Sequence, residues 1–443
     1  MPPSASLRDV RPCYTATMNI VAIVLDRLHA GYLGCYGNTW IATPAFDRIA
    51  AEGFLFQQAI IDSPDLADAY EAMWRGTHAA ERSEGDRASA PSLAELARRS
   101  GARTVLVTDD PAIADHRAAE AFDETVELDV TDDDVSRDAG PAREVEKTQA
   151  ARLFAEASEH VVTDKPFFVW LHTRGLGGAW DAPSEFRERY VDEDDPPAPT
   201  FTHLETRRLP LDVDLDERFG LAQAYAGQVT LTDVCLGGLL AHLDETGLAD
   251  DTALLIVSPR GIALGEHDDV GTSDRRLNAE IVQVPWLLRL PKSYGKLRRP
   301  QALVQPCDVY HTLAELLGAA PSAEGWGRSA ISLCTIPLST GRPTWRDRAL
   351  VGGCDSIGIR TAGWYRLESR RTGAEDSTGD ESAPAPQLFA KPDDWWEVND
   401  VADRCPDIVE RLGEVRKQTA EALAAGKPVE AIAADDPLVT GMA

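Results

Sequence analysis

Short apolar runs recur along the chain, and longer segments with a helical pattern separate them. Runs of about four to eight apolar residues are typical of strands that are buried on both faces of a parallel sheet. Such runs lie at 19–25, 104–107, 167–171, 252–257 and 285–290. Because strands alternate with helices, the pattern predicts an α/β fold whose parallel or mixed sheet has helices on both faces.

The helical segments have recognisable ends. Segments 44–53 and 91–101 each begin with proline and end with glycine, which are preferred just inside the start and just past the end of a helix. Segment 219–247 is longer and also ends at a glycine. Its leucines fall on one helical face: Leu236, Leu239, Leu240 and Leu243. We therefore expect it to pack on the sheet as an amphipathic helix.

The pattern changes after about residue 340. Segments 348–352, 356–360 and 364–370 are short, and Gly-containing turns join them, which indicates antiparallel strands. Residues 372–386 are rich in Ser, Gly, Asp, Glu and Pro and predict an exposed loop, and a final helix is expected at about 406–425. These features predict a small C-terminal subdomain. The expected parts are a disordered leader (1–17), an α/β domain (18–340), an α+β subdomain (341–425) and a tail (426–443).

Composition narrows the class of partner. The chain has 44 Lys and Arg against 73 Asp and Glu, a formal net charge of −29. Nucleic-acid binding and binding to an anionic membrane are therefore not expected, because both need a net positive face, although a local basic pocket remains compatible with this charge. No apolar run reaches the roughly 18 residues of a membrane span.

The cysteines and the N-terminus indicate the compartment. The seven cysteines are scattered, and none forms a C-x-x-C motif, so neither a disulfide framework nor a structural zinc site is expected. Residues 1–17 lack the apolar core of a signal peptide, and Met18, directly before the first strand, is an alternative start. Together these features predict a cytoplasmic protein.

Several motifs in order along the chain carry a family resemblance. The opening stretch from Leu25 to Asn38 reads LDRLHAGYLGCYGN, and 264–267 reads LGEH. Further matching pieces are 43–53, 248–261, 284–285, 308–313, 363–367 and 396–400. Over about 18–412 the chain resembles the sulfatase family of the alkaline-phosphatase superfamily. The resemblance implies an α/β/α sandwich around a large mixed sheet, with a small C-terminal antiparallel-sheet subdomain.

The residues that the family uses to hold a divalent metal are largely replaced. The resemblance implies two adjacent aspartates after the first strand, where this chain has Asp26 and Arg27. It implies a Ser-Asp-His-Gly type sequence later, where this chain has Ser258, Pro259, Arg260 and Gly261. Proline offers no side-chain ligand atom, and arginine stays protonated, so one of the four ligands remains. No metal and no other cofactor are therefore expected.

The family's nucleophile is also absent. The family uses a Cys or Ser in a Cys-x-Pro-Ser-Arg motif, and the matching stretch here runs from Leu66 to Tyr70. Leu66 has no nucleophilic atom, and Tyr70 replaces the supporting arginine. Ser63 or Asp65 could act after a shift of register, but turn or helix-capping roles are simpler. The positions of the family's other sulfate-binding cations fall near Asp109-Asp110-Pro111, Gly177 and Thr272.

Two histidine-containing segments have more than one interpretation. His172 and Arg174 follow a predicted strand, and we expect them to line the old active-site cleft, since clefts of α/β proteins form at the carboxyl ends of strands. The alternative is a loop that packs Trp180 against the sheet, whereas the glycines of this loop lack the spacing of a nucleotide-binding motif. His267 is also counted with the residues of the old active-site cleft, where it is expected to be a structural, hydrogen-bonding histidine, with a catalytic acid as the alternative.

These observations favour a sulfatase-fold protein without sulfatase catalysis, a pseudoenzyme. Arg27 and Arg260 would bring fixed positive charge to the place of the dication, and Asp26 would pair with one of them. No residue is assigned a catalytic role. The expected ligand is a small anion (sulfate, phosphate or carboxylate) or else a protein partner. The alternatives are an active sulfuric-ester or phosphoric-ester hydrolase with a noncanonical site, and an acidic scaffold with a vestigial cleft; both arginines could also be turned to the surface.

Overall fold

A seven-stranded sheet forms the centre of the computed structural model, with strand order β2-β12-β8-β1-β6-β4-β5. The structure describes residues 18–81, 90–129, 140–162, 164–210, 212–272, 276–319, 325–335, 345–369 and 384–441. The predicted leader 1–17 lies outside these residues. The five strands predicted from the sequence are β1 (Asn19–Leu25), β4 (Arg103–Thr108), β6 (Phe167–Thr173), β8 (Thr252–Val257) and β12 (Trp286–Arg289).

One predicted strand direction is wrong. β1 pairs in parallel with both β6 and β8, and β4 pairs in parallel with β6 and with β5 (Glu124–Glu127). The run at 285–290, predicted as a parallel strand, forms β12, which is antiparallel to β8 and to β2 (Phe54–Leu55). The described residues between β8 and β12 form only the short helix α10 (Ala279–Val282) and short strands, and none of them forms a long crossover helix. A parallel partner would need a crossover connection, commonly a helix.

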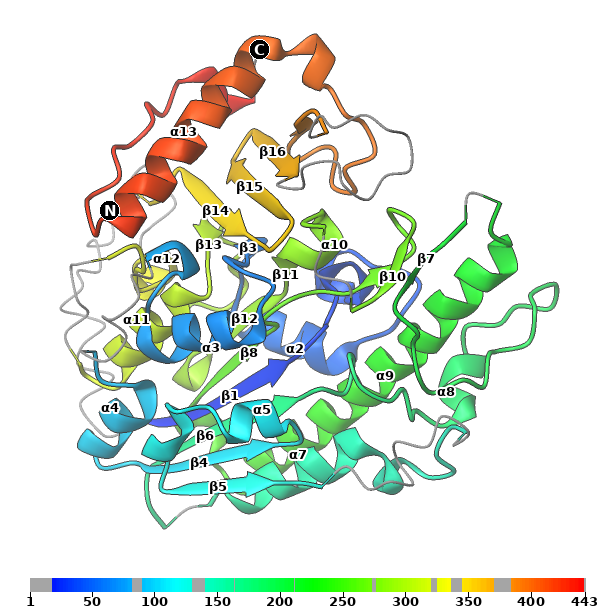
Figure 1. The fold of residues 1–443 in the computed structure, drawn as a ribbon. Coiled ribbons are helices and arrows are strands. Elements are labelled where there is room, and N and C mark those ends of the chain that lie inside the picture. Colours follow the sequence, from blue (N-terminus) through cyan, green and yellow to red (C-terminus); the bar gives the residue numbers. More distant parts are fainter. Residues whose placement is uncertain are drawn as a thin grey trace, which may run out of the picture.

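Helices cover both faces of this sheet (Figure 1). Val21, Ile23 and Leu25 of β1 point to one face, where they pack with α2 (Pro44–Glu52), α7 (Gln149–Glu159) and α9 (Leu215–Glu245). The alternate residues Ile20, Ala22 and Val24 point to the other face and pack with α3 (Leu66–Arg75), α4 (Leu93–Arg99) and α11 (Cys307–Leu316). Both faces of the sheet are apolar along its inner strands, from β12 to β4, because these strands are buried on both sides. This confirms the α/β/α sandwich.

The small C-terminal sheet is also confirmed. Its four antiparallel strands, in order, are β14 (Arg348–Gly352), β15 (Ser356–Thr361), β16 (Trp364–Ser369) and β17 (Gln387–Ala390). The sequence did not predict β17. The helix α13 (Pro406–Ala424) packs on this sheet, as Figure 1 shows in orange and red. Most of the predicted loop 372–386 and the predicted boundary near 340 lie outside the described residues, so the division into domains stays a prediction.

Smaller elements complete the fold. Two minor sheets have the orders β7-β10-β9 and β11-β3-β13. Their strands are β3 (Gln58–Ile60), β7 (Arg207–Arg208), β9 (Ala263–Leu264), β10 (Asp269–Gly271), β11 (Gln283–Val284) and β13 (Leu303–Val304). The remaining α-helices are α5 (Pro111–Ala114), α8 (Ser184–Glu188), α12 (Ile331–Thr335) and α14 (Pro437–Thr440). Among the described residues, no helix combines the length and the apolar character that a membrane span requires.

Candidate functional site

The carboxyl ends of four neighbouring parallel strands meet at one edge of the central sheet. β8, β1, β6 and β4 are consecutive in the sheet order, and they end at Val257, Leu25, Thr173 and Thr108. The segments that follow these strands contain most of the site residues predicted from the sequence. This edge is where α/β proteins form their clefts, so the sheet brings together residues far apart in the chain.

Asp26 and Arg260 form a two-pronged ion pair at this edge. Arg260 donates from Nε to Oδ1 and from Nη2 to Oδ2 of Asp26, each at 3.0 Å. Its Nη1 donates to the carbonyl of Pro64 at 3.0 Å, just before α3 begins. Burial raises the pKa of Asp26, but the charges of Arg260 and Arg27 outweigh burial and hold this pKa below its ordinary value. Arg260 thus bridges the end of β1 and the start of α3.

Arg27 lies against the same loop as Arg260. Its amide donates to the carbonyl of Arg260 at 3.1 Å, and its Nη1 donates to the carbonyl of Gly261 at 3.0 Å. Its side chain is only 1% exposed, and its backbone has a positive φ of 67°. The two arginines therefore meet in the structure, and the alternative that both turn to the surface is wrong. Pro259 lies beside them in the same loop.

His172 is buried behind this ion pair. Its Nδ1 lies 2.6 Å from the hydroxyl of Tyr70, and its Nε2 lies 3.7 Å from Oδ2 of Asp110. His172 is completely buried, so its ring is not presented to a ligand. Burial raises the pKa of Asp110, but the hydrogen bond and charge of His172 outweigh burial and lower the pKa overall. No pattern in the sequence indicated the Tyr70–His172 contact, although Tyr70 stands where the resemblance implies a supporting arginine.

Arg174, by contrast, is only partly buried. Its amide donates to Oδ1 of Asp109 at 2.8 Å, which fixes the start of the loop after β6. Its guanidinium has no hydrogen-bond or ion-pair partner among the described residues. Burial raises the pKa of Asp109 above its ordinary value in spite of the Arg174 amide and the charge of His172. The guanidinium of Arg174 is therefore the cationic group of this edge that is best placed to take an external anion.

The start of α3 contains the other candidates. Asp65 is the N-cap of α3 and accepts from the amide of Asp68 at 3.0 Å, while Leu66 is the first helical residue. The hydroxyl of Ser63 donates to Oδ2 of Asp68 at 2.9 Å and accepts from the amide of Asp65 at 3.2 Å. These are turn and capping contacts. The Ser63–Asp68 contact also puts a hydroxyl beside a carboxylate.

His267 belongs to a separate cluster beneath the C-terminal sheet. Its Nδ1 lies 2.8 Å from Oε1 of Glu280, and its Nε2 lies 3.4 Å from the carbonyl of Glu397. Burial lowers the pKa of His267, but the hydrogen bond and charge of Glu280 raise it to about 9 overall. The ring is therefore protonated at neutral pH and joins the two parts of the fold.

The side chains at the four ligand positions do not fit a hard divalent cation. Such ions take oxygen ligands, and here Asp26 already binds Arg260 through both oxygens. In the described part of the chain, no group of three or more His, Cys, Asp or Glu could hold a metal ion.

Gly261 offers a test of how closely the loop after β8 packs against the backbone of α10. A Cβ at residue 261 would lie 1.9 Å from the backbone carbonyl oxygen of Glu280, which cannot yield easily. We expect Gly261→Ala to lower the free energy of unfolding by about 3 kcal/mol, measured by urea denaturation. Gly238→Ala on α9 is the control, because nothing lies within 4 Å of its Cβ, and it should preserve or raise stability. Equal losses in the two variants would contradict this account.

The fold and the place of the site define an alkaline-phosphatase-like protein. Such a protein has an α/β/α sandwich around a large mixed sheet and a small antiparallel C-terminal sheet. The chain belongs to the sulfatase family, because the family model "Sulfatase" matches residues 18–319.

Two curated relatives match the chain to different extents. Human iduronate 2-sulfatase is 22% identical over 411 residues, which cover 73% of this chain and 71% of that protein. The multifunctional alkaline phosphatase superfamily protein PehA of Trinickia caryophylli is 34% identical over 127 residues, covering 28% of this chain. That match spans only 23% of PehA.

Solved structures share the fold across nearly the whole chain. The phosphonate monoester hydrolase of Agrobacterium radiobacter superposes with a TM-score of 0.71 at 18% identity, covering 92% of this chain and 95% of that chain. The protein BT4656, in complex with its substrate D-glucosamine-2-N,6-O-disulfate, has a TM-score of 0.71 at 17% identity. That match covers 94% of this chain and 99% of BT4656.

Proposed function

We propose that this sulfatase-family protein binds a small oxyanion at the carboxyl edge of its central sheet and does not hydrolyse sulfate esters by the family's metal-dependent route. The ligand class is sulfate, phosphate or carboxylate. The observation that carries the proposal is the Asp26–Arg260 ion pair. Asp26 is the one carboxylate that remains at the family's metal-ligand positions, and the guanidinium of Arg260 binds both of its oxygens. A guanidinium brings the positive charge without the open coordination positions of a metal.

Arg174 supports the anion-binding part of the proposal. Arg174 is partly buried at the same edge of the sheet as the ion pair, and its Nε is buried without a hydrogen-bond partner among the described residues. Its planar guanidinium suits the oxygens of sulfate, phosphate or carboxylate. The neighbouring carboxylates are already engaged, since Asp26 binds Arg260 and Asp109 accepts from the Arg174 amide. A protein partner and a cytoplasmic location, both predicted from the sequence, stay predictions.

Ester hydrolysis is a second candidate, and the comparisons support it better than they support an inactive cleft. The family match and the names of the similar proteins point to hydrolysis of sulfate esters and phosphonate esters. One contact in this chain favours it as well. The Ser63 hydroxyl donates to the Asp68 carboxylate at 2.9 Å, and a neighbouring base is what an activated serine nucleophile needs.

A combined assay separates the two candidates. The protein is incubated with calcium, magnesium or manganese, desalted and analysed for bound metal by elemental mass spectrometry. It is then assayed with 4-nitrophenyl sulfate, 4-nitrophenyl phosphate and a 4-nitrophenyl phosphonate. We expect the desalted protein to retain less than one molar equivalent of metal. We also expect it to turn over the three esters no faster than the Ser63→Ala variant does. Retained metal together with turnover that Ser63→Ala abolishes would overturn the proposal in favour of hydrolysis.

Anion binding is tested by thermal stabilisation with inorganic sulfate and phosphate. We expect Arg174→Ala to weaken the stabilising effect about tenfold in apparent affinity, because a charge-assisted hydrogen bond contributes roughly 1.5–3 kcal/mol. Arg99→Ala is the matched control, since it removes one exposed guanidinium at the end of α4, just before the amino end of β4. Equal responses of the two variants would show that the anion acts only through the overall charge.

A further inference from the structure

A hollow lies between the segment 31–40 after β1 and the loop 391–400 after β17. Its volume is about 410 Å³, within the range of small-molecule sites. It is lined by Gly31, Tyr36, Gly37, Asn38, Thr39, Trp40, Trp395 and Trp396. None of these residues belongs to the predicted site at the carboxyl edge, and none carries a formal charge. We call this hollow the tryptophan pocket.

The pocket presents unusually exposed indole rings. Trp40 and Trp396 are each 41% exposed, whereas Trp74, Trp170 and Trp180 are buried in the fold. The indole N–H groups of Trp40, Trp395 and Trp396 donate no hydrogen bond within the described residues. Exposed apolar rings grouped in a hollow are typical of a binding site, and an indole adds a hydrogen-bond donor at the edge of its flat face.

The first side of the pocket is held in place by its own contacts. The ring of Trp40 lies 5.1 Å from that of Tyr190 and 6.0 Å from that of Phe219, measured between centroids. The side chain of Asn38 is used within the segment, because its Oδ1 accepts from the amides of Trp40 and Ile41 at 2.8 Å. The Trp40 ring is therefore positioned before any ligand arrives.

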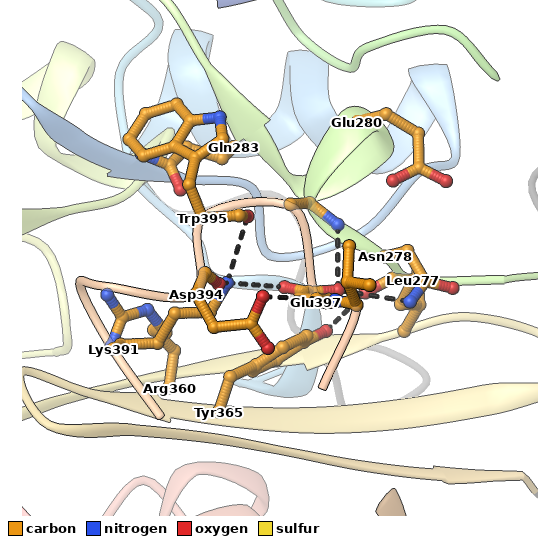
Figure 2. Close-up of polar contacts among 12 residues, drawn as sticks. Leu277, Asn278, Glu280, Gln283, Arg360, Tyr365, Lys391, Asp394, Trp395 and Glu397 are labelled. Carbon is orange, nitrogen blue, oxygen red and sulfur yellow. Dashed lines mark hydrogen bonds and ion pairs between the residues drawn. The ribbon is translucent and has the colours of Figure 1, made fainter. Parts of the chain in front are cut away.

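A buried ionic cluster holds the second side, the loop 391–400 (Figure 2). Nζ of Lys391 donates to the carbonyls of Asp394 at 2.8 Å and Trp395 at 3.1 Å. It also lies 2.9 Å from Oε1 of Glu397, and the two side chains are 3% and 1% exposed. Oε2 of Glu397 accepts from the side chain of Asn278 at 3.0 Å, which ties the loop to the start of α10. Figure 2 shows Lys391 and Glu397 beside the backbone of this loop.

The two sides touch at Gly31. A Cβ at this position would lie 2.8 Å from the Trp396 ring, so only glycine allows this approach. The Trp396 ring also lies 5.8 Å from the ring of His29, between centroids. Because both sides are fixed, a ligand would bind without the cost of ordering a loop.

We propose that the tryptophan pocket binds a neutral sugar ring. The apolar C–H face of a pyranose matches a flat indole, and its equatorial hydroxyls can accept from the indole N–H groups. An ion is disfavoured because the lining offers no opposite charge, and a desolvated charge without a partner is costly. The net charge of −29 further disfavours an anionic sugar. The residues that line this pocket differ from those of the anion site proposed at the carboxyl edge.

The test uses saturation-transfer difference NMR with the methyl glycosides of glucose, galactose, mannose and xylose, on the full chain. We expect at least one glycoside to bind with a Kd at or below about 1 mM. Trp40→Ala and Trp396→Ala should each weaken binding about tenfold or more, because each removes a stacking face. Val398→Ala is the control, since Val398 is 83% exposed and does not line the pocket.

The Gly31→Ala variant tests whether the close contact between Gly31 and the Trp396 ring positions the loop 391–400 for binding. It should weaken glycoside binding by displacing the Trp396 ring, while leaving stabilisation by sulfate unchanged. Absence of binding by all four glycosides would overturn the proposal. So would binding that is unaffected by Trp40→Ala and Trp396→Ala, or binding only of tetramethylammonium or of a proline-rich peptide through the same two residues.

Discussion

Replacing Asp26 with asparagine is expected to lower the free energy of unfolding by about 3 kcal/mol at neutral pH. Arg260 donates to both oxygens of Asp26 at 3.0 Å. The side chain of Asp26 is 5% exposed, and that of Arg260 is 16% exposed. Asparagine keeps the size of the side chain but removes the negative charge. The positively charged guanidinium groups of Arg27 and Arg260 then remain in the buried site without the negative charge of Asp26. Urea denaturation followed by circular dichroism measures the loss.

The pH dependence of this loss has a defined sign. The pKa of Asp26 is lower in the folded state than its ordinary value, because the charges of Arg260 and Arg27 outweigh burial. The contribution of Asp26 to stability is therefore fully present above the ordinary carboxyl pKa of about 4 and is lost as the pH falls through the folded-state pKa. The difference between wild type and Asp26→Asn should stay constant from pH 7 to about pH 5 and shrink in more acidic solution.

Asp65→Asn is the matched control. Asp65 is exposed and caps α3, and asparagine caps a helix about as well as aspartate does. This variant should change stability by less than about 0.5 kcal/mol. Added sulfate should recover part of the stability of Asp26→Asn, since an anion can take the place of the lost carboxylate. A similar loss in both variants, or no response to sulfate, would contradict a charge-paired site.

The strands could be predicted from the sequence because burial on both faces makes each run almost wholly apolar. β1 and β8 were predicted with the bounds that the structure has. The direction of β12 could not be predicted, since parallel and antiparallel buried strands have the same composition. β17 could not be predicted because it has only four residues, of which Leu388 and Phe389 alone are buried.

The contacts of the site depend on strand order rather than on local pattern. Asp26 and Arg260 are 234 positions apart, and they meet because β1 lies between β8 and β6 in the sheet. The resemblance placed both residues at one site, but only the register of β1 with β8 gives the ion pair its geometry. The Tyr70–His172 contact needed the position of α3 as well. The tryptophan pocket joins segments more than 350 positions apart, so no local motif could predict it.

Restoring the family's ligand set should create a metal site. We expect the triple variant Arg27→Asp, Pro259→Asp and Arg260→His to be less stable than wild type without divalent cations, because carboxylates then face one another. Calcium at about a thousand times its Kd should raise the free energy of unfolding by about 4 kcal/mol, since metal binds only the folded state. Thermal unfolding with and without calcium measures the gain, and elemental mass spectrometry measures the bound metal.

The backbone of the cleft supports this expectation. The Arg27 amide donates to the carbonyl of Arg260 at 3.1 Å, and Ser258 cross-links the same two loops through the Leu28 amide at 3.2 Å and the Arg260 carbonyl at 2.7 Å. The φ of 67° at residue 27 is uncommon for arginine and better tolerated by aspartate. Arg27→Asp alone is the control, since it still leaves Arg260 on Asp26 and should gain no stability from calcium. A triple variant that folds but retains no metal would show that the loops no longer hold the ligand geometry.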